Sequence, residues 1–245
     1  MPVVTGILAP EGSVWCVVVA AGSGRRYGGA KQFESVGGVR VLDRSLDVAL
    51  DRCDGVVLVV AADAVEGERR LAAARRAEGV AAPAAVVAGG STRSESVRRG
   101  LDEVPADADV VVVHDAARPL APAELFDRVV RAVRSGAAGA VPVVPVVDTI
   151  RDVDGGVVDR ERLRAVQTPQ AFDAAALRAA HAGVSEATDD AALVQAAGGT
   201  LAMVEGAVRN IKLTTPEDRI VIDAFLAAGD GGSESAPDAP GGGDS

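Results

Sequence analysis

Residues 17–32, VVVAAGSGRRYGGAKQ, place an apolar run directly before a glycine-rich segment that carries two arginines and a lysine. The whole apolar run, residues 14–20, is too short for a helix and rich in β-branched residues, so it predicts a buried strand. The glycines after it permit positive φ angles and let a ligand approach the backbone closely. Successive N–H groups of such a turn converge on an anion. The stretch therefore predicts a strand followed by an anion-binding loop.

Two well-known glycine loops do not fit this segment. The dinucleotide-binding fingerprint requires glycine where Tyr27 stands, and the P-loop requires lysine directly after its last glycine. Here Ala30 intervenes, and Gln32 rather than Ser or Thr follows Lys31. Two interpretations stay open: a triphosphate cradle reinforced by the neighbouring basic side chains, and a strand-to-helix turn with solvated arginines.

Lysine is rare in this chain, because only Lys31 and Lys212 among its 25 Lys and Arg residues are lysines. An ammonium is a compact, rotatable point charge, whereas a guanidinium is a planar fork. A lysine retained in an arginine-rich sequence indicates a position that needs the compact charge. We therefore take both lysines as candidate site residues.

The composition fits one large α/β domain, or at most two small ones. The 245-residue chain is 48% hydrophobic, which is enough for a sizeable core, and only 2% aromatic. Its formal net charge of −10 argues against general nucleic-acid binding, which needs a basic face. An anionic ligand must therefore meet a local basic cluster.

We expect neither a secretory signal nor a membrane span. Residues 1–15 have no basic start and no long apolar core. No run approaches the roughly 18 apolar residues of a membrane-spanning helix. Cys16 and Cys53 form neither a zinc pattern nor a disulfide framework, which favours a reducing, cytoplasmic location.

Short β-branched runs alternate with Ala-, Arg- and Leu-rich segments along the chain. Strands are predicted over residues 14–20, 56–61, 85–88, 109–114, 138–144 and 200–204. Helices are predicted over residues 42–51, 65–78, 94–103, 122–135, 173–182, 189–197 and 216–228. This alternation is typical of a doubly wound, mostly parallel Rossmann-like α/β sheet, whose ligands gather at the carboxyl ends of the strands.

Residues 146–164 interrupt the alternation. An Asp-Gly-Gly turn signal inside them separates two β-rich stretches and predicts a β-hairpin arm projecting from the sheet. Thr149 and Arg160 lie on opposite sides of this hairpin, and the residues alone indicate solvated side chains. Residues 229–245 have no apolar periodicity, so we expect a disordered tail after a folded domain of residues 14–228.

The predicted strand 109–114 ends in His114 and continues into Asp115. A carboxylate at this place suits a hydrated Mg²⁺ that accompanies phosphates, because magnesium prefers oxygen ligands and takes only one or two carboxylates from a protein. A strand-end ion pair is the alternative. Arg118 is placed either to face the same phosphates or to pair with Asp115. His114 is interpreted as a packed strand residue rather than a catalyst.

Two further segments precede predicted helices. Residues 89–96, GGSTRSES, contain glycines that let the backbone approach a flat base. Ser94 or Ser96 either caps the helix or bonds the ligand. In residues 188–190, TDD, an ordinary helix N-cap explains the pattern at least as well as a ligand contact does.

Together these motifs resemble the 2-C-methyl-D-erythritol 4-phosphate cytidylyltransferase family over about residues 14–228. The resemblance rests on AAGSGRR at 20–26, KQ at 31–32, GG at 89–90 with Arg93 and Ser96, HDAARP at 114–119, DT at 148–149, QTPQ at 167–170, TDD at 188–190 and NIK at 210–212. Their joint order is specific to the nucleotidyltransferase superfamily. The family commonly has Asp where Ser91 stands and Glu where Asp190 stands.

The resemblance implies transfer of the CMP moiety of CTP to 2-C-methyl-D-erythritol 4-phosphate with Mg²⁺ and release of pyrophosphate, a step of non-mevalonate isoprenoid biosynthesis. The residues agree with this chemistry. A phosphate monoester is largely dianionic at neutral pH, so it needs no general base. The catalyst must instead neutralise two repelling anions and stabilise charge on the α-phosphate, which is work for positioned cations and a metal ion.

The resemblance also implies a role for each motif residue. Catalytic roles are implied for Arg26, Lys31, Arg160 and Lys212, nucleotide contacts for Ala20, Ala21, Gly22, Gly24, Gly90, Ser91, Ser96 and Asp115, substrate contacts for Thr149, Arg160, Thr168, Arg118 and Thr188, and a metal contact for Asp115. A homodimer is implied as well, in which the 146–164 arm packs on the neighbouring subunit and completes its site.

Two other functions stay open from the sequence. A ribitol-5-phosphate cytidylyltransferase has the same cradle and a different acceptor, and residues alone do not separate it securely. A non-catalytic nucleotide-binding regulator is the third interpretation. The joint retention of Lys31, Asp115, Lys212 and Arg160 argues against it, because a sensor binds its nucleotide without transition-state cations.

Overall fold

The computed structural model describes residues 12–22, 24, 27–183 and 189–228. The predicted tail, and the predicted site residues Arg26 and Thr188, lie outside the described residues.

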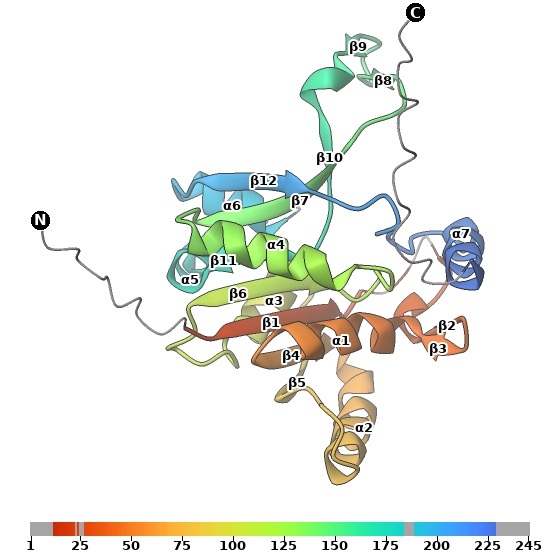
Figure 1. Ribbon diagram of the computed structural model, residues 1–245, viewed down its shortest axis with the longest axis vertical. Coiled ribbons are helices and arrows are strands. Elements are labelled where there is room, and N and C mark those ends of the chain that lie inside the picture. Colours follow the sequence, from red (N-terminus) through yellow and green to blue (C-terminus); the bar gives the residue numbers. More distant parts are fainter. Residues whose placement is uncertain (1–11, 23, 25–26, 184–188, 229–245) are drawn as a thin grey trace, which may run out of the picture.

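An eight-stranded, mostly parallel sheet forms the centre of the fold (Figure 1). Its main path runs β10-β7-β11-β6-β1-β4-β5, and β12 pairs with β7. The strands are β1 (Val14–Ala20), β4 (Gly55–Val60), β5 (Ala85–Ala88), β6 (Val110–Asp115), β7 (Gly139–Pro145), β10 (Arg164–Val166), β11 (Gln170–Asp173) and β12 (Leu201–Glu205). Among these described strands, only β10 and β11 run antiparallel to the strands that they pair with.

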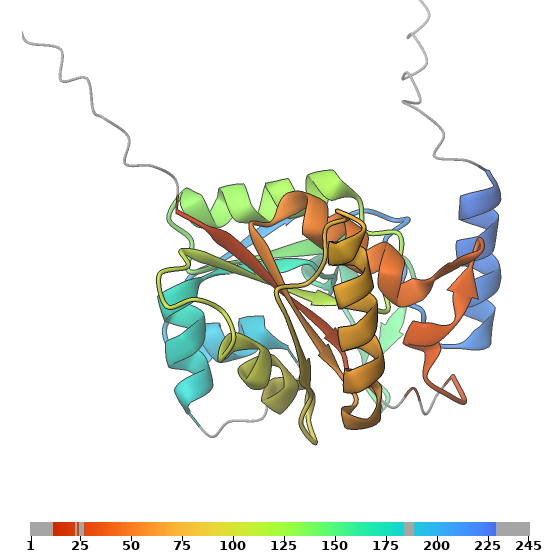
Figure 2. The same cartoon turned by 90° about the horizontal axis from the view of Figure 1, so that it is seen from below.

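Helices cover both faces of the sheet, as Figure 2 shows. They are α1 (Val41–Arg52), α2 (Val65–Ala77), α3 (Arg93–Leu101), α4 (Ala123–Arg134), α5 (Ala174–Ala182), α6 (Asp190–Ala196) and α7 (Pro216–Ala227), with short 3-10 turns η1 (Lys31–Phe33), η2 (Ala62–Ala64) and η3 (Arg160–Arg162). The predicted doubly wound α/β fold is confirmed. None of the helices in the described ranges is long and apolar enough to cross a membrane.

The alternating side-chain directions along β1 explain why the sheet has a core on each face. Cys16, Val18 and Ala20 pack in one cluster with residues of α1, α2 and α4, whereas Val17 packs on the other face with residues of α3, α5 and α6. Successive strand residues point to opposite faces, and both faces of a central parallel strand are buried. A run of small β-branched residues therefore satisfies both cores at once.

All six predicted strands and seven predicted helices are confirmed, with ends that differ by at most about two residues. Four strands were not predicted from the sequence: β10, β11, and the small hairpin of β2 (Ser35–Val36) and β3 (Val39–Arg40). The run QAFD of β11 is too short to show a period, and it becomes a strand because it fits between β6 and β7.

The predicted hairpin arm is confirmed. Its strands β8 (Ile150–Arg151) and β9 (Val157–Val158) pair antiparallel with each other, and Gly155 takes the positive φ of the turn, 103°. Figure 1 shows both strands well beyond the edge of the main sheet.

Candidate active site

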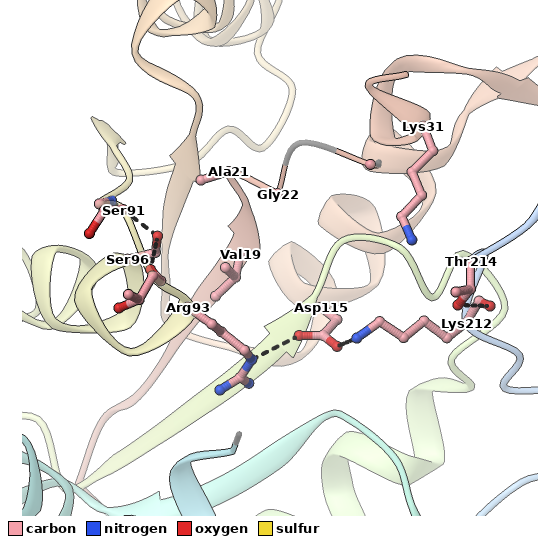
Figure 3. Close-up of a pocket in the computed structure, with 13 residues that line it drawn as sticks. Val19, Ala21, Gly22, Lys31, Ser91, Arg93, Ser96, Asp115, Lys212 and Thr214 are labelled. Carbon is pink, nitrogen blue, oxygen red and sulfur yellow. Dashed lines mark hydrogen bonds and ion pairs between the residues drawn. The ribbon is translucent and has the colours of Figure 1, made fainter. Parts of the chain in front are cut away.

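A pocket of about 640 Å³ lies at the carboxyl ends of β1 and β6 (Figure 3). The chain continues from β1 to β4 and β5 on one side, and β6 then pairs on the other side of β1. Ligands of doubly wound sheets bind at such a reversal of strand order. The lining residues are Val19, Ala21, Gly22, Gly24, Lys31, Gly90, Ser91, Thr92, Arg93, Ser96, Asp115, Lys212 and Thr214.

Asp115 is the carboxylate of this pocket. It ends β6 directly beside Val19 of β1, and its Oδ2 accepts a hydrogen bond from Lys212 Nζ at 2.6 Å. Its Oδ1 lies 3.5 Å from Arg93 Nε. Burial by itself would raise the pKa of Asp115, but Lys212 and Arg93 outweigh burial and hold this pKa well below its ordinary value. The carboxylate is therefore ionised near neutral pH.

Lys31 and Lys212 bring two ammonium groups to the same region (Figure 3). Lys31 lies in η1, and its Nζ donates to the carbonyl oxygen of Leu213, the neighbour of Lys212. The buried Gln32 fixes η1 to the end of β1, because its Nε2 donates to the carbonyl oxygen of Ala20 at 2.9 Å. Two segments far apart in sequence thus supply ammonium groups to one pocket.

The glycine loop between β1 and η1 requires glycine at Gly24. Gly24 has a φ of +61°, and a Cβ at this position would lie 1.8 Å from the carbonyl oxygen of Gly29. An L side chain would therefore be strained there and would also clash. Gly22 and Gly24 both line the pocket, as the anion-binding interpretation requires.

The opposite wall comes from the loop before α3. A Cβ at Gly89 would lie 2.3 Å from Ala21 Cβ, so glycine permits the two loops to touch. Gly90 N–H donates to Ser96 Oγ at 3.0 Å, and this hydroxyl donates to the carbonyl oxygen of Thr92 at 2.8 Å. Of the two alternatives left open for Ser94 and Ser96, capping of the helix does not hold, because Thr92 Oγ1 accepts the capping bond from Glu95 N–H. The sequence pattern pointed to the serines instead, because the predicted helix began at residue 94, one residue later than α3 begins.

Ser91, a predicted nucleotide contact, lines the same wall. Its hydroxyl donates to Glu95 Oε2 at 2.8 Å and its N–H donates to the same oxygen at 2.7 Å. These bonds from Ser91, together with Arg99, lower the pKa of Glu95 to about 2. The carboxylate therefore orders the loop that forms this wall.

The structure does not bring every predicted residue into the pocket. Arg118 is nearly buried, and its guanidinium donates to the carbonyl oxygens of Asn210 at 2.7 Å and Val166 at 3.4 Å. Thr168 is also buried, and its Oγ1 accepts the Asp115 N–H bond at 3.0 Å. Thr168 therefore holds the pocket residue Asp115 from behind, and Arg118 joins the segments of Asn210 and Val166. Their roles as substrate contacts stay predictions.

The arm residues lie apart from this pocket. Thr149 is exposed, and Arg160 in η3 contacts the Val147 carbonyl oxygen and the Glu161 carboxylate, all within the arm. Neither residue lines the pocket around Lys31. In a single chain, Thr149 and Arg160 are thus exposed side chains, as the residues alone indicated.

His114 is fully buried and packs against Phe126 with a ring-centroid distance of 5.2 Å. Burial, partly opposed by Asp115, lowers its pKa to about 4, so the ring is neutral at pH 7. The interpretation of His114 as a packed strand residue is confirmed.

Comparison with known proteins identifies the family. The family model "2-C-methyl-D-erythritol 4-phosphate cytidylyltransferase" matches residues 14–228. The chain belongs to this family. The 2-C-methyl-D-erythritol 4-phosphate cytidylyltransferase of Rhodococcus jostii is 42% identical over 229 residues, which cover 89% of this chain and 97% of that protein. The crystal structure of the enzyme so named from Thermus thermophilus is 36% identical with a TM-score of 0.70, covering 89% of this chain and 99% of that one.

Some relatives are longer. A protein of Clavibacter michiganensis named "Bifunctional enzyme IspD/IspF" is 44% identical over 229 residues, which cover 90% of this chain and 56% of that protein. The chain thus spans little more than half the length of the bifunctional relatives that it matches, between 55% and 58%. The predicted family resemblance is confirmed over residues 14–228.

Arg93 lines the pocket, although the sequence analysis gave it no role beyond its place in a family motif. It is the first residue of α3. A cation at a helix N-terminus opposes the helix dipole, so an arginine there needs anionic partners. That conflict was the available signal, and the partners are Asp190 at 2.6 Å and Asp115 at 3.5 Å.

The donor set fits a magnesium ion of the kind that this family's reaction implies. Within the described ranges no group of three or more His, Cys, Asp or Glu side chains is arranged to hold a metal. Mg²⁺ in phosphate-transfer sites usually has one or two carboxylates and completes its shell with substrate phosphates and water. The single ionised Asp115 in a pocket with two lysines matches that pattern.

Proposed function

We propose that the protein transfers the CMP moiety of CTP to 2-C-methyl-D-erythritol 4-phosphate, giving 4-diphosphocytidyl-2-C-methyl-D-erythritol and pyrophosphate. One observation carries the proposal: Lys31, Asp115 and Lys212 converge with a glycine-lined wall in one pocket of a chain that belongs to this family. A cytoplasmic location stays a prediction.

In the proposed reaction, a phosphate oxygen of the acceptor attacks the α-phosphorus of CTP. The new P–O bond forms as the bond from the α-phosphorus to the bridging oxygen of the β-phosphate breaks, and pyrophosphate leaves with that electron pair. The acceptor phosphate is largely dianionic at pH 7, so no side chain has to remove a proton first. The barrier is the repulsion between two anions and the charge that gathers on the α-phosphate.

Each pocket cation has a distinct part in this proposal. Lys31 would contact the triphosphate, since it lies beside the glycine loop. Lys212 would move from Asp115 to the α-phosphate, and its side chain is 41% exposed, which leaves room for that movement. Asp115 would hold Mg²⁺, which supplies further charge neutralisation on the phosphates when bound.

The cytosine ring would lie against the wall formed by Ala21, Gly90, Ser91 and Ser96. Because the loops of Ala21 and Gly89 touch, the surface that they offer to the base is small, which favours a pyrimidine over a purine. Arg160 and Thr149 would bind the acceptor phosphate from the arm of the neighbouring subunit in a homodimer. The exposed apolar side chains of the arm support this assembly, because Val147 is 79% and Val157 64% exposed.

The test is a panel of phosphorylated polyols assayed with CTP and Mg²⁺ by pyrophosphate release. We expect turnover with 2-C-methyl-D-erythritol 4-phosphate and little with ribitol 5-phosphate, which serves as the matched acceptor. Preference for ribitol 5-phosphate would replace the proposed acceptor. CTP binding without pyrophosphate release for any acceptor would indicate a nucleotide-binding regulator.

A further inference from the structure

A line of paired charged and polar side chains leads from the pocket into the protein. Lys212 Nζ contacts Asp115 Oδ2 at 2.6 Å, and Asp115 Oδ1 faces Arg93 Nε at 3.5 Å. Arg93 Nη1 contacts Asp190 Oδ2 at 2.6 Å, and Asp190 Oδ1 lies 3.0 Å from His181 Nε2. Figure 3 shows the pocket end of this line, with Arg93 and Lys212 on either side of the Asp115 carboxylate.

Asp190 is the stronger partner of Arg93. Its side chain is fully buried in the first turn of α6, whereas the Asp115 side chain is 12% exposed. Burial alone would lower the pKa of Arg93, but Asp190 and Asp115 outweigh burial and raise it. The guanidinium is therefore held as a cation, with its shorter contact directed away from the pocket carboxylate.

His181 fixes the orientation of Asp190. It is 4% exposed on α5 and contacts the carboxylate oxygen that Arg93 leaves unused. Both Asp190 oxygens thus have a partner, and the carboxylate has one orientation rather than two. His181 therefore holds the Asp190 carboxylate in the position from which it binds Arg93.

Removing Asp190 would leave the Arg93 guanidinium, whose side chain is only 25% exposed, without its main counter-ion. Such a charge is costly and moves to the next available anion. The adjacent anion is Asp115, and a guanidinium readily binds both oxygens of a carboxylate. Arg93 would then occupy Asp115 Oδ1, while Lys212 occupies Oδ2. Both oxygens of Asp115 would then be paired when the metal–nucleotide complex arrives, before Lys212 turns to the α-phosphate.

We propose that Asp190 is a positioning residue that holds the Arg93 guanidinium back from Asp115, so that Asp115 Oδ1 stays available to the divalent cation that enters with the nucleotide. This inference rests on the proposed function, because it needs Asp115 to meet a metal–nucleotide complex. It assigns Asp190 a part in metal affinity without any contact between Asp190 and the metal.

The test measures the affinity of the intact protein for Mn²⁺ in the presence of a non-hydrolysable CTP analogue. Electron paramagnetic resonance reports the free Mn²⁺ during the titration. We expect Asp190→Asn to weaken Mn²⁺ binding by about tenfold or more, the range usual for groups that position a metal ligand. Asp189→Asn is the matched control. Asp189 caps α6 by accepting from Ala192 N–H at 2.8 Å, and asparagine caps equally well, so Mn²⁺ affinity should not change.

A double variant separates positioning from a general structural role. Combining Asp190→Asn with Arg93→Met removes the competing cation, so Mn²⁺ affinity should return to within about twofold of wild type. Should Asp190→Asn fail to fold, Arg93→Met alone is expected to bind Mn²⁺ at least as tightly as wild type. Absence of recovery in the double variant, or a tenfold loss in Arg93→Met, would overturn the inference.

The same Mn²⁺ titration separates a failure of the proposed function from a failure of the role given to Asp190. Wild-type protein that binds no Mn²⁺ with the CTP analogue, or binds it equally well after Asp115→Asn, contradicts the proposed function. Normal binding by wild type, loss in Asp115→Asn and no change in Asp190→Asn contradict only the role of Asp190.

Discussion

The pocket around Asp115 and the hairpin arm are built in opposite ways. In the pocket, Asp115 lies in a buried strand end, and ion pairs from two other segments reach its carboxylate. In the arm, β8 and β9 pair only with each other, and Arg160 contacts only arm residues in the described part of the chain. The described pocket residues all come from one chain and contact one another, whereas the arm presents Thr149 and Arg160, its predicted substrate contacts, to solvent.

The difference has a physical cause. Strand ends of the main sheet are fixed by two cores of buried side chains, so the residues after them start from defined positions and are held by further bonds within the same chain. A two-stranded hairpin is marginally stable in water by itself. The arm, with Val153 fully exposed and Val147 79% exposed, offers apolar area that another surface would bury. We infer that the pocket binds nucleotide in any assembly state, and that acceptor binding depends on assembly.

Lys31→Ala tests the pocket half and carries the largest expected effect. An interaction that is strongest in the transition state appears mainly in kcat, so kcat should fall by about 10²-fold or more while CTP binding weakens far less. Steady-state kinetics at saturating CTP and calorimetry of CTP binding measure the two quantities. Arg70→Ala is the control, since it removes an equally charged but exposed side chain from a surface pair with Glu66 at 4.0 Å. Normal turnover by Lys31→Ala would mean that Lys31 has no catalytic role.

Mixed dimers test whether the two halves come from different chains. Lys31→Ala and Arg160→Ala proteins refolded together in equal amounts should give about half hybrid dimers, each with one doubly altered site and one intact site. Activity near a quarter of wild type should then return, although each parent is almost inactive. Verified hybrids without recovery would place each site within a single chain and contradict the dependence of acceptor binding on assembly.

Arg160→Lys sharpens the comparison on the arm side with a smaller effect. A guanidinium binds two phosphate oxygens at once and an ammonium does not, so the KM for the phosphorylated alcohol should rise by about tenfold at little changed kcat. Arg162→Lys is the matched control, because Arg162 is an exposed residue of the same 3-10 turn. Equal kinetics for both variants would mean that Arg160 has no special part in acceptor binding.

Much of the pocket followed from the sequence because its residues directly follow predicted strands. The positions of Gly22, Gly24, Lys31, Gly90 and Asp115 at strand ends or in the loops after them depend only on the pattern of apolar runs and breaks. Parallel strands bring all such ends to one edge of the sheet. The arm was also predictable, since its turn signal and β-rich flanks are local features.

The sequence by itself determined the order of six strands of the main sheet and of the seven helices, the glycine loop after the first strand, and the positions of its two lysines. Only the tertiary structure decided which charges meet: Arg93 and Asp190 are 97 residues apart in sequence, as are Asp115 and Lys212. Periodicity reports the environment of a residue and not the identity of its distant partner. The tertiary structure decided β11 as well, whose four residues become a strand between β6 and β7 because unpaired backbone groups cannot stay buried there.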